Sequence, residues 1–341
     1  QIDSIKDWHA IRVSSQSKEI LYCSNAPIVK EHENFKGRLF QTPNGQWVVD
    51  FGQNIAGFVE VSFEGQAGSS VTLTHGETLD SEGNFTNENF QDRSRHKEGG
   101  THQRLTIYAK DGLNHYKTRF SIFGFRYALV ETDLDMTNAI FTAIAVYSDL
   151  SVIGTFESGN EKLNQFVQNT LWSLKSNFVD VPTDCPTRER AAWTGDIGVF
   201  VDTALDFTDS VAFLEKWLGE CRLNQHEDGK IANIAPRINE PNMFSKLLAG
   251  SVGWGDAVVL IPYAIYKRTR DTKVLQENYP MMKKWVNYLE LRAKARPDNL
   301  SEDEVSTFED YTIDTGVDYG EWCEPGITPE QSMRSGNYDV A

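Results

Sequence analysis

The stretch Ser158-Gly159-Asn160-Glu161 divides the chain into two parts of different texture. A serine followed three residues later by a glutamate is typical of a capping box, which predicts a helix with Ser158 as its N-cap. Beyond it, apolar residues recur at steps of three and four residues, the spacing of one helical face. These residues are Leu163, Phe166, Val167, Leu171 and Leu174.

Ahead of this stretch, short β-rich runs alternate with glycine turns. Apolar and polar side chains alternate along residues 57–63 and 70–75, and the glycines of residues 65–68 indicate a turn between them. Strands at this spacing predict an antiparallel β-sandwich. The polar residues 80–100 are expected to form a long loop. Further β-rich runs are 47–51, 103–108 and 127–131.

Beyond residue 155 the apolar period is helical, and loops rich in Asp, Pro, Gly and Trp separate the segments. Residues 156–341 suffice for about six helices with their loops, whereas a closed toroid of twelve needs about twice as many. We therefore expect this chain to be part of a longer protein. The expected later helices are 197–205, 211–223, 257–267 and 273–295.

Composition excludes several classes of protein. The chain has 33 Lys and Arg against 49 Asp and Glu, a formal charge of −16, which argues against nucleic acid and anionic membranes as partners. The sequence contains no run of about 18 apolar residues, so no membrane span is predicted. The cysteines and histidines lack metal-ligand spacing, so we expect no metal and no cofactor. Free thiols fit a reducing compartment, and we expect a cytoplasmic protein.

The densest group of chemically active side chains lies in residues 180–196. Prolines flank Asp184 on both sides, so this segment is expected to be a fixed loop between two helices. Its carboxylates include Asp184, Glu189 and Asp196, and it also carries Trp193 and two arginines. The alternative interpretation is a surface loop whose Arg and Glu side chains pair locally.

Two further segments combine tryptophan, glycine and acid. Gly253-Trp254-Gly255-Asp256 precedes an expected helix, where Asp256 is alternatively only an N-cap. Tyr319-Gly320-Glu321-Trp322 lies in the acidic C-terminal segment. An indole face stacks on the C–H face of a sugar, and carboxylates accept hydrogen bonds from its hydroxyls. The three segments together predict a carbohydrate site.

The run from Asp180 to Asp196 resembles the signature loop of bacterial α-L-rhamnosidases of glycoside hydrolase family 78. The resemblance covers roughly residues 45–341. It implies a multidomain β + α protein, in which β-sandwich domains precede an (α/α)6 catalytic toroid that is only partly present in this chain. The expected domains are the end of a preceding β domain or a linker (1–35), a β-sandwich (36–150) and the N-terminal part of the toroid (151–341). Other segments in the family's order are 50–57, 123–127, 147–150, 253–256 and 277–285.

The resemblance also implies an activity and a role for each site residue. The family hydrolyses terminal α-L-rhamnosides with inversion, so the expected partners are rhamnose-containing glycosides or polysaccharides. The sequence leaves open whether the protein forms a homodimer. Glu189 matches the general acid, and the general base is expected outside this chain. The expected sugar-binding residues are Asp184, Trp193, Asp196, Trp254, Asp256 and Trp322.

A general acid must hold a proton at the working pH, and two arginines beside Glu189 oppose this. We therefore expect at least one of Arg188 and Arg190 to point away and to pair with Asp184 or Asp180. Two rival functions remain. One is an inverting (α/α)6 glycosidase or phosphorylase for another sugar, and the other is a non-catalytic sugar-binding protein.

Overall fold

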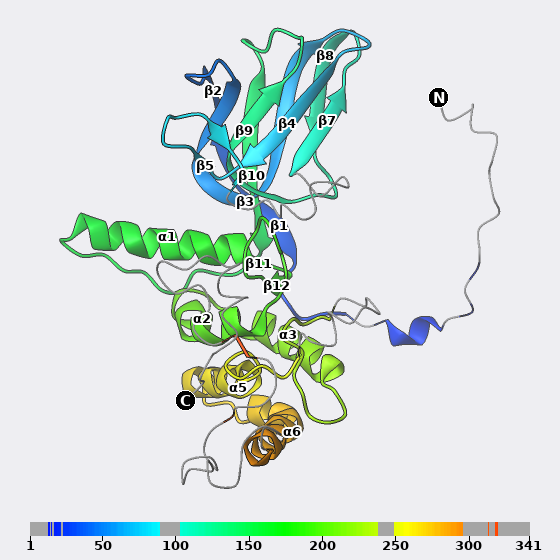
Figure 1. Ribbon diagram of the computed structural model, residues 1–341, viewed down its shortest axis with the longest axis vertical. Helices are drawn as coiled ribbons and strands as arrows, with labels where there is room; N and C mark the ends of the chain where they lie inside the picture. Colours follow the sequence, from blue (N-terminus) through cyan, green and yellow to red (C-terminus); the bar gives the residue numbers. More distant parts are fainter. Residues whose placement is uncertain are drawn as a thin grey trace, which may run out of the picture.

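The computed structural model describes residues 13, 15, 17–21, 23–88, 103–237, 249–295, 313, 318 and 319. Figure 1 shows a β domain at one end and a group of helices at the other, with helix α1 (Glu161–Asn177) between them. The strands are β1 (Val29–Lys36), β2 (Arg38–Gln41), β3 (Trp47–Gly65), β4 (Ser70–Gly76), β5 (Thr78–Leu79), β6 (Phe85–Thr86), β7 (Arg104–Tyr108), β8 (Gly112–Lys117), β9 (Phe123–Glu131), β10 (Ile140–Ser148), β11 (Phe178–Val179) and β12 (Val181–Pro182). The other helices are α2 (Thr194–Phe207), α3 (Val211–Asn224), α5 (Ala257–Thr269), α6 (Lys273–Lys294) and a short 3₁₀ helix, Lys18–Ile20.

Eight strands form one antiparallel sheet in the order β1-β10-β3-β9-β4-β7, and β2 and β8 also pair with β3. The sequence predicted separate strands over 47–51 and 57–63, but β3 is continuous through both. A register shift between Asp50 and Ile55 joins them, and Gly52 there has a φ of 77°. Glycine adopts this left-handed backbone without steric cost. The predicted antiparallel β domain is confirmed.

The inward side chains of this sheet form one hydrophobic core. Val59 and Leu73 are fully buried in it, as the alternating pattern predicted, and so is Phe125 of β9. The predicted long loop over residues 80–100 is wrong at its start, because β5 and β6 pair as a small hairpin there. Residues 89–100 lie outside the described part of the chain.

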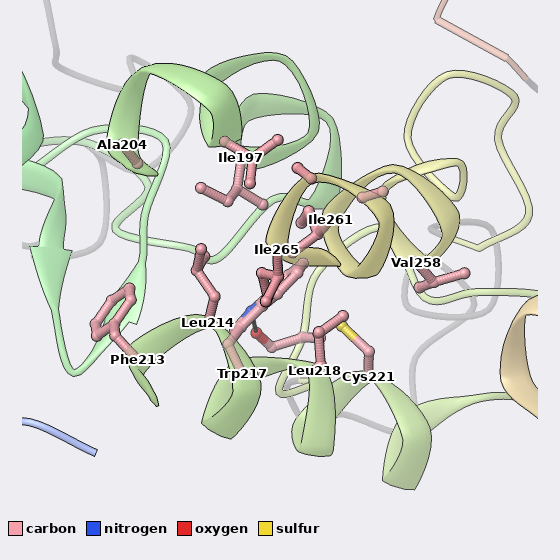
Figure 2. Packing of buried hydrophobic residues seen from close by; sticks show 14 of the residues in the cluster. Ile197, Ala204, Phe213, Leu214, Trp217, Leu218, Cys221, Val258, Ile261 and Ile265 are labelled. Carbon is pink, nitrogen blue, oxygen red and sulfur yellow. Dashed lines mark hydrogen bonds between the residues drawn. The ribbon is translucent and has the colours of Figure 1, made fainter. Parts of the chain in front are cut away.

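The helices after residue 155 confirm the predicted helical part. α2 packs against α5, and α5 packs against α3 and α6. Their shared core is visible in Figure 2, where Trp217 of α3 lies between apolar side chains of the neighbouring helices. The indole N–H of Trp217 donates to the carbonyl of Ala235 at 2.7 Å, so this buried polar group is satisfied.

The first helix begins differently from the prediction. Its N-cap is Asn160, not Ser158: the Asn160 side chain accepts hydrogen bonds from the N–H groups of Lys162 and Leu163. The apolar face is also only partly covered. Leu174 is 2% exposed, whereas Phe166 is 66% exposed, so only the C-terminal half of α1 is packed in the described structure.

Contacts between α1 and the β domain fix the start of the next loop. Lys175 of α1 donates to Glu33 of β1 at 2.6 Å, and the hydroxyl of Tyr147 donates to the same carboxylate. Just beyond α1, the N–H of Asp180 donates to the hydroxyl of Ser148 at 3.0 Å. The loop after α1 is therefore anchored on the sheet.

Two features are absent from the described residues. Among them, no helix combines the length and apolar character needed to cross a membrane. Within the same residues, no group of three or more His, Cys, Asp or Glu side chains is arranged to hold a metal ion.

Candidate active site

The candidate site is built on the loop between α1 and α2, residues 183–193. Two hydrogen bonds close this loop on itself. The N–H of Asp184 donates to the carbonyl of Ala191, and the N–H of Ala191 donates to the Asp184 carboxylate, both at 3.0 Å. Because α2 begins directly after the loop, the carboxylates of the loop and of the first helical turn are held near one another.

Glu189 lies in this loop with both carboxylate oxygens engaged. The indole N–H of Trp193 donates to Oε2 at 2.8 Å, and Arg188 donates to Oε1 at 2.6 Å. The backbone N–H of Glu189 is directed at the sulfur of Cys185 at 3.3 Å. The Glu189 side chain is 34% exposed, so a ligand in solvent can reach it. The structure thus brings together Glu189 and Trp193, two of the residues singled out from the sequence.

The two arginines beside Glu189 point in different directions. Arg188 pairs with Glu189, whereas Arg190 turns to the β domain and donates to the carbonyl of Ile122 and the side chain of Gln103. One guanidinium therefore points away, as expected. Its predicted partner was wrong, because the neutral oxygens of the adjoining sheet lie within reach of Arg190 and satisfy its donors.

The predicted aspartate partners of that guanidinium are engaged elsewhere. Asp180 pairs with Lys216 of α3 at 3.0 Å. The Asp184 carboxylate accepts the N–H of Ala191, as described above.

Asp184 and Asp196 are both shifted toward the neutral acid. Burial raises the pKa of Asp184, and the charge of Glu189 adds to the rise. Burial, followed by the charges of Asp184 and Glu189, raises the pKa of Asp196 to about 6. Like charges close together disfavour ionisation, which adds to the effect of burial at both aspartates. The site therefore holds three interacting carboxyl groups beside a tryptophan.

The raised pKa of Asp196 predicts a pH-dependent stability. In the unfolded chain the group titrates near 3.8, so the folded protein binds the proton more tightly between pH 4 and 6. The stabilising contribution is fully present below about pH 4 and is lost as the pH rises through about 6. We expect Asp196→Asn to raise the free energy of unfolding above pH 6 by about 1 kcal/mol, since solvent reaches part of this side chain and screens the charge.

This expectation is checked by urea unfolding of wild type and Asp196→Asn at pH 4 and pH 7.5. Asp202→Asn, further along the same helix and paired with Lys267, is the matched control. A gain from Asp196→Asn that is equal at both pH values would contradict the electrostatic explanation.

Trp254 lies against the start of α2. A Cβ atom at Gly195 would lie only 2.7 Å from the Trp254 ring, so the indole packs directly on the helix backbone. Tyr319 connects the aromatic side chains: its ring centroid is 4.6 Å from that of Trp254 and 5.8 Å from that of Trp193. Burial raises the pKa of Tyr319, which keeps the phenol neutral. The structure thus groups three rings beside the carboxylates.

Asp256 is held by two hydrogen bonds at the start of α5. It occupies the N-cap position of α5 but makes no side-chain capping bond. Its Oδ1 accepts from the indole N–H of Trp285 at 2.9 Å, and its Oδ2 accepts from the N–H of Gly253 at 3.0 Å. Asp256 therefore fixes the turn that carries Trp254.

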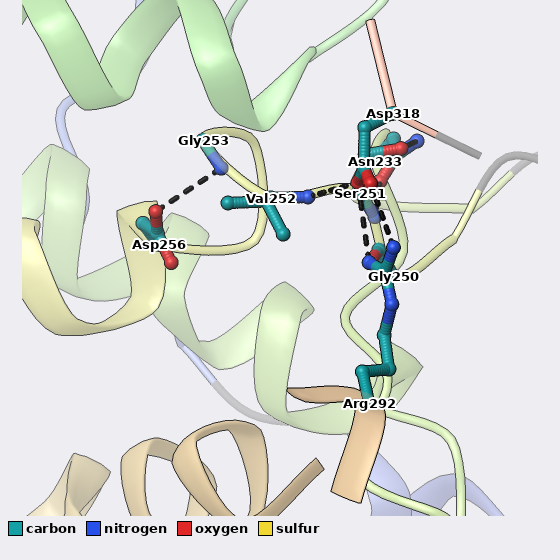
Figure 3. A network of polar contacts seen from close by, with 8 residues as sticks. All are labelled: Asn233, Gly250, Ser251, Val252, Gly253, Asp256, Arg292 and Asp318. Atoms are coloured by element: carbon teal, nitrogen blue, oxygen red, sulfur yellow. Dashed lines mark hydrogen bonds and ion pairs between the residues drawn. The ribbon is translucent and has the colours of Figure 1, made fainter. Parts of the chain in front are cut away.

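A buried ion pair anchors Tyr319. Arg292 of α6 donates to Asp318 at 2.6 Å, and the two side chains are only 8% and 9% exposed. The same Asp318 carboxylate accepts the N–H of Val252, so it also ties down the turn before Trp254 (Figure 3). This anchor places Tyr319 beside the indoles.

Sequence reasoning missed Tyr319 although it named the motif that contains it. The family resemblance implies Trp322 as the sugar-binding residue of that motif, and Trp322 lies outside the described residues. The available signal was the position of Tyr319 directly after Asp318. A buried aspartate needs a cation as partner, and such a pair fixes the residue that follows it. The distant partner, Arg292, has no local signature in the sequence.

Comparison with known proteins places the chain among carbohydrate-active proteins. Residues 40–147 match the bacterial alpha-L-rhamnosidase concanavalin-like domain, and residues 151–338 match the bacterial alpha-L-rhamnosidase 6 hairpin glycosidase domain. An α-L-rhamnosidase of Alteromonas sp. (strain LOR) is 33% identical over 295 residues, which are 85% of this chain and 28% of that protein.

Two solved structures are similar in fold and sequence. The Streptomyces avermitilis α-L-rhamnosidase complexed with L-rhamnose aligns with a TM-score of 0.70 at 32% identity, over 80% of this chain and 26% of that one. The native enzyme from Aspergillus terreus aligns with a TM-score of 0.74 at 28% identity, over 96% of this chain and 36% of that one. The chain spans about a quarter of the length of the curated relatives it matches. Because the six-hairpin match takes in more than half of the chain, this chain belongs to the bacterial α-L-rhamnosidase six-hairpin glycosidase family.

Proposed function

We propose that the protein containing this chain hydrolyses terminal α-L-rhamnosyl residues with inversion of configuration, and that Glu189 is the general acid. The observation that carries the proposal is the Glu189 carboxyl, bound by the Trp193 indole and set among two further carboxyl groups. A proton donor in such a setting suits the protonation of a departing glycosidic oxygen.

Charged groups of both signs surround Glu189. Burial raises the pKa of Asp184 and of Asp196, and the charge of Glu189 contributes to both shifts, so both carboxyl groups lie near it. Arg188 pairs with the Glu189 carboxylate at 2.6 Å, and Arg190 is held away from it. One guanidinium thus pairs with Glu189, where the sequence allowed two.

The aromatic rings support a deoxy sugar as the ligand. Rhamnose is a 6-deoxyhexose, so one side of it presents a methyl group and C–H bonds instead of a hydroxymethyl group. The faces of Trp193, Trp254 and Tyr319 supply apolar surface for these groups, and the carboxyl groups nearby accept hydrogen bonds from the sugar hydroxyls. A relative of similar fold was solved with L-rhamnose bound.

Inversion requires a second carboxylate about 6.5–9.5 Å from the acid, with a water between them. Asp184 lies in the same loop as Glu189, and Asp196 lies just after it in the first turn of α2. We assign both aspartates to sugar binding. Within the described residues we therefore assign no general base.

The test compares nitrophenyl α-L-rhamnoside with the α-L-fucoside and the α-glucoside, using the full-length protein. We expect kcat/KM to be at least about 100-fold higher for the rhamnoside, since a misplaced hydroxyl leaves buried polar groups unpaired. NMR of the first product should show β-L-rhamnose. Preference for another sugar, or retention of the α-anomer, would contradict the proposal.

A further inference from the structure

Gln103 lies in the β domain, just before β7. Its side-chain amide is hydrogen-bonded near the candidate site. The residue is 3% exposed. Its Nε2 donates to the carbonyl of Gly124 at 3.0 Å, and its Oε1 accepts from the N–H of Gly124 at 2.7 Å. The same Oε1 accepts from Arg190 at 3.0 Å. A buried amide with three hydrogen bonds is rigidly oriented.

The other end of this contact is the arginine that follows Glu189. Arg190 has a φ of 51°, a left-handed backbone that a residue with a side chain rarely adopts. Such strain persists only where the surroundings hold it in place. Arg190 donates to Thr187 within the loop at 3.0 Å, and to Ile122 and Gln103 of the β domain.

The partners of Arg190 are neutral oxygens, although a carboxylate lies next to it in the chain. Burial lowers the pKa of this guanidinium, which means that its surroundings do not favour the charge. A buried guanidinium bonded to neutral oxygens orients the groups around it through directed hydrogen bonds and contributes little ion-pair energy. Arg190 therefore fixes the loop through neutral oxygens and forms no ion pair with Glu189 in the described structure.

The sheet also contacts the loop through a glycine. A Cβ atom at Gly124 would lie 2.6 Å from the methyl of Thr187 and 2.9 Å from the ring of Pro186. The loop thus packs directly on Gly124 of β9, the residue whose N–H and carbonyl are both hydrogen-bonded to Gln103. The β domain holds the loop by packing and by the Gln103–Arg190 contact together.

We infer that Gln103 is a positioning residue for Glu189: it holds Arg190 on the β domain, which fixes the turn that carries Glu189 and keeps a second guanidinium off its carboxyl. The inference rests on the proposed role of Glu189. It gives the β domain a part in the reaction, because the geometry of the acid then depends on a side chain of the neighbouring domain.

The experiment uses Gln103→Leu in the full-length protein. We expect kcat to fall by about 10- to 100-fold with a much smaller change in KM, because a displacement of about 1 Å at a reacting group has effects of this size. Asn114→Leu is the matched control. Asn114 is also a buried amide of the β domain with three hydrogen bonds, but all of them go to Lys110 and Gly112. Both variants should lower the Tm, and only Gln103→Leu should lower kcat.

A double-mutant cycle then tests whether Gln103 acts through Arg190. Arg190→Met alone should lower kcat as Gln103→Leu does, and the pair should lower it little further. Additive losses, or a kcat for Gln103→Leu within twofold of wild type, would overturn the inference. If Gln103→Leu fails to fold, Arg190→Met decides alone: a kcat within twofold of wild type overturns the inference.

Hydrogen exchange separates this inference from the proposed function. We expect faster exchange of the backbone amides of residues 184–193 in Gln103→Leu but not in Asn114→Leu, whether or not the wild type cleaves rhamnosides. An inactive wild type with this exchange pattern rejects the proposed function and supports the positioning of the loop. An active wild type whose loop exchange is unchanged by Gln103→Leu rejects the positioning.

Discussion

Replacing Glu189 by glutamine is expected to lower kcat for a rhamnoside with an alcohol leaving group by about 10²- to 10⁴-fold, the usual contribution of a general acid. Glutamine keeps the size of the side chain and an oxygen that accepts from Trp193, so the loop and the sugar site should stay in place. It cannot donate a proton to the departing oxygen at useful acidity. Binding of L-rhamnose, measured by calorimetry, should therefore change little.

The leaving group distinguishes lost acid catalysis from a distorted site. A dinitrophenol departs without protonation, so for that rhamnoside the loss in Glu189→Gln should shrink to about tenfold or less. Glu131→Gln is the control, because Glu131 is another glutamate paired with an arginine, Arg104 at 2.7 Å, and it lies in the β domain. Equal losses on both substrates, or full activity of Glu189→Gln, would remove Glu189 from its proposed role.

The helices were predictable because each buries a face that recurs with the helical period. Residues 211–223 were expected for α3, and the helix is Val211–Asn224 with Leu214, Trp217 and Leu218 fully buried. The same reasoning was incomplete for α1. Periodicity states which residues share a face, but it does not state that a partner covers the face, and Phe166 is 66% exposed.

The candidate site was predictable where its parts are neighbours in the chain. Glu189 and Trp193 are four residues apart in one loop, so the local fold of that loop is enough to bring them within hydrogen-bond distance. The partners of Arg190 were not predictable: Ile122 and Gln103 lie 68 and 87 residues earlier, each directly before a strand of the β domain. A local motif shows that an arginine needs acceptors, and only the assembled fold shows which acceptors are within reach.

The buried ion pair between Arg292 and Asp318 leads to the second large expected effect. We expect Arg292→Met to lower the free energy of unfolding of the helical part by about 3–5 kcal/mol, because it leaves the Asp318 carboxylate buried without its cation. The carboxylate is 9% exposed and would keep the N–H of Val252 as a partner, which cannot neutralise it. Urea unfolding followed by tryptophan fluorescence measures the change.

A matched control separates the buried pair from the general effect of a cation at a helix end. Arg268 lies in the last turn of α5, as Arg292 does in α6, and it pairs with Asp206 at 3.0 Å in solvent. Arg268→Met should therefore cost less than about 1 kcal/mol. The double variant Arg292→Met/Asp318→Leu should recover most of the lost stability, since an apolar pair of similar volume replaces a buried ion pair at little cost.

The same variants connect stability to the sugar site. Asp318 directly precedes Tyr319, whose ring contacts Trp193 and Trp254, so losing the anchor should free that ring and weaken L-rhamnose binding even where the protein stays folded. Arg292→Met should thus lose affinity, whereas Arg268→Met should not. Unchanged affinity in Arg292→Met, together with the lost stability, would show that Tyr319 is no part of the sugar site and that the ion pair serves the fold alone.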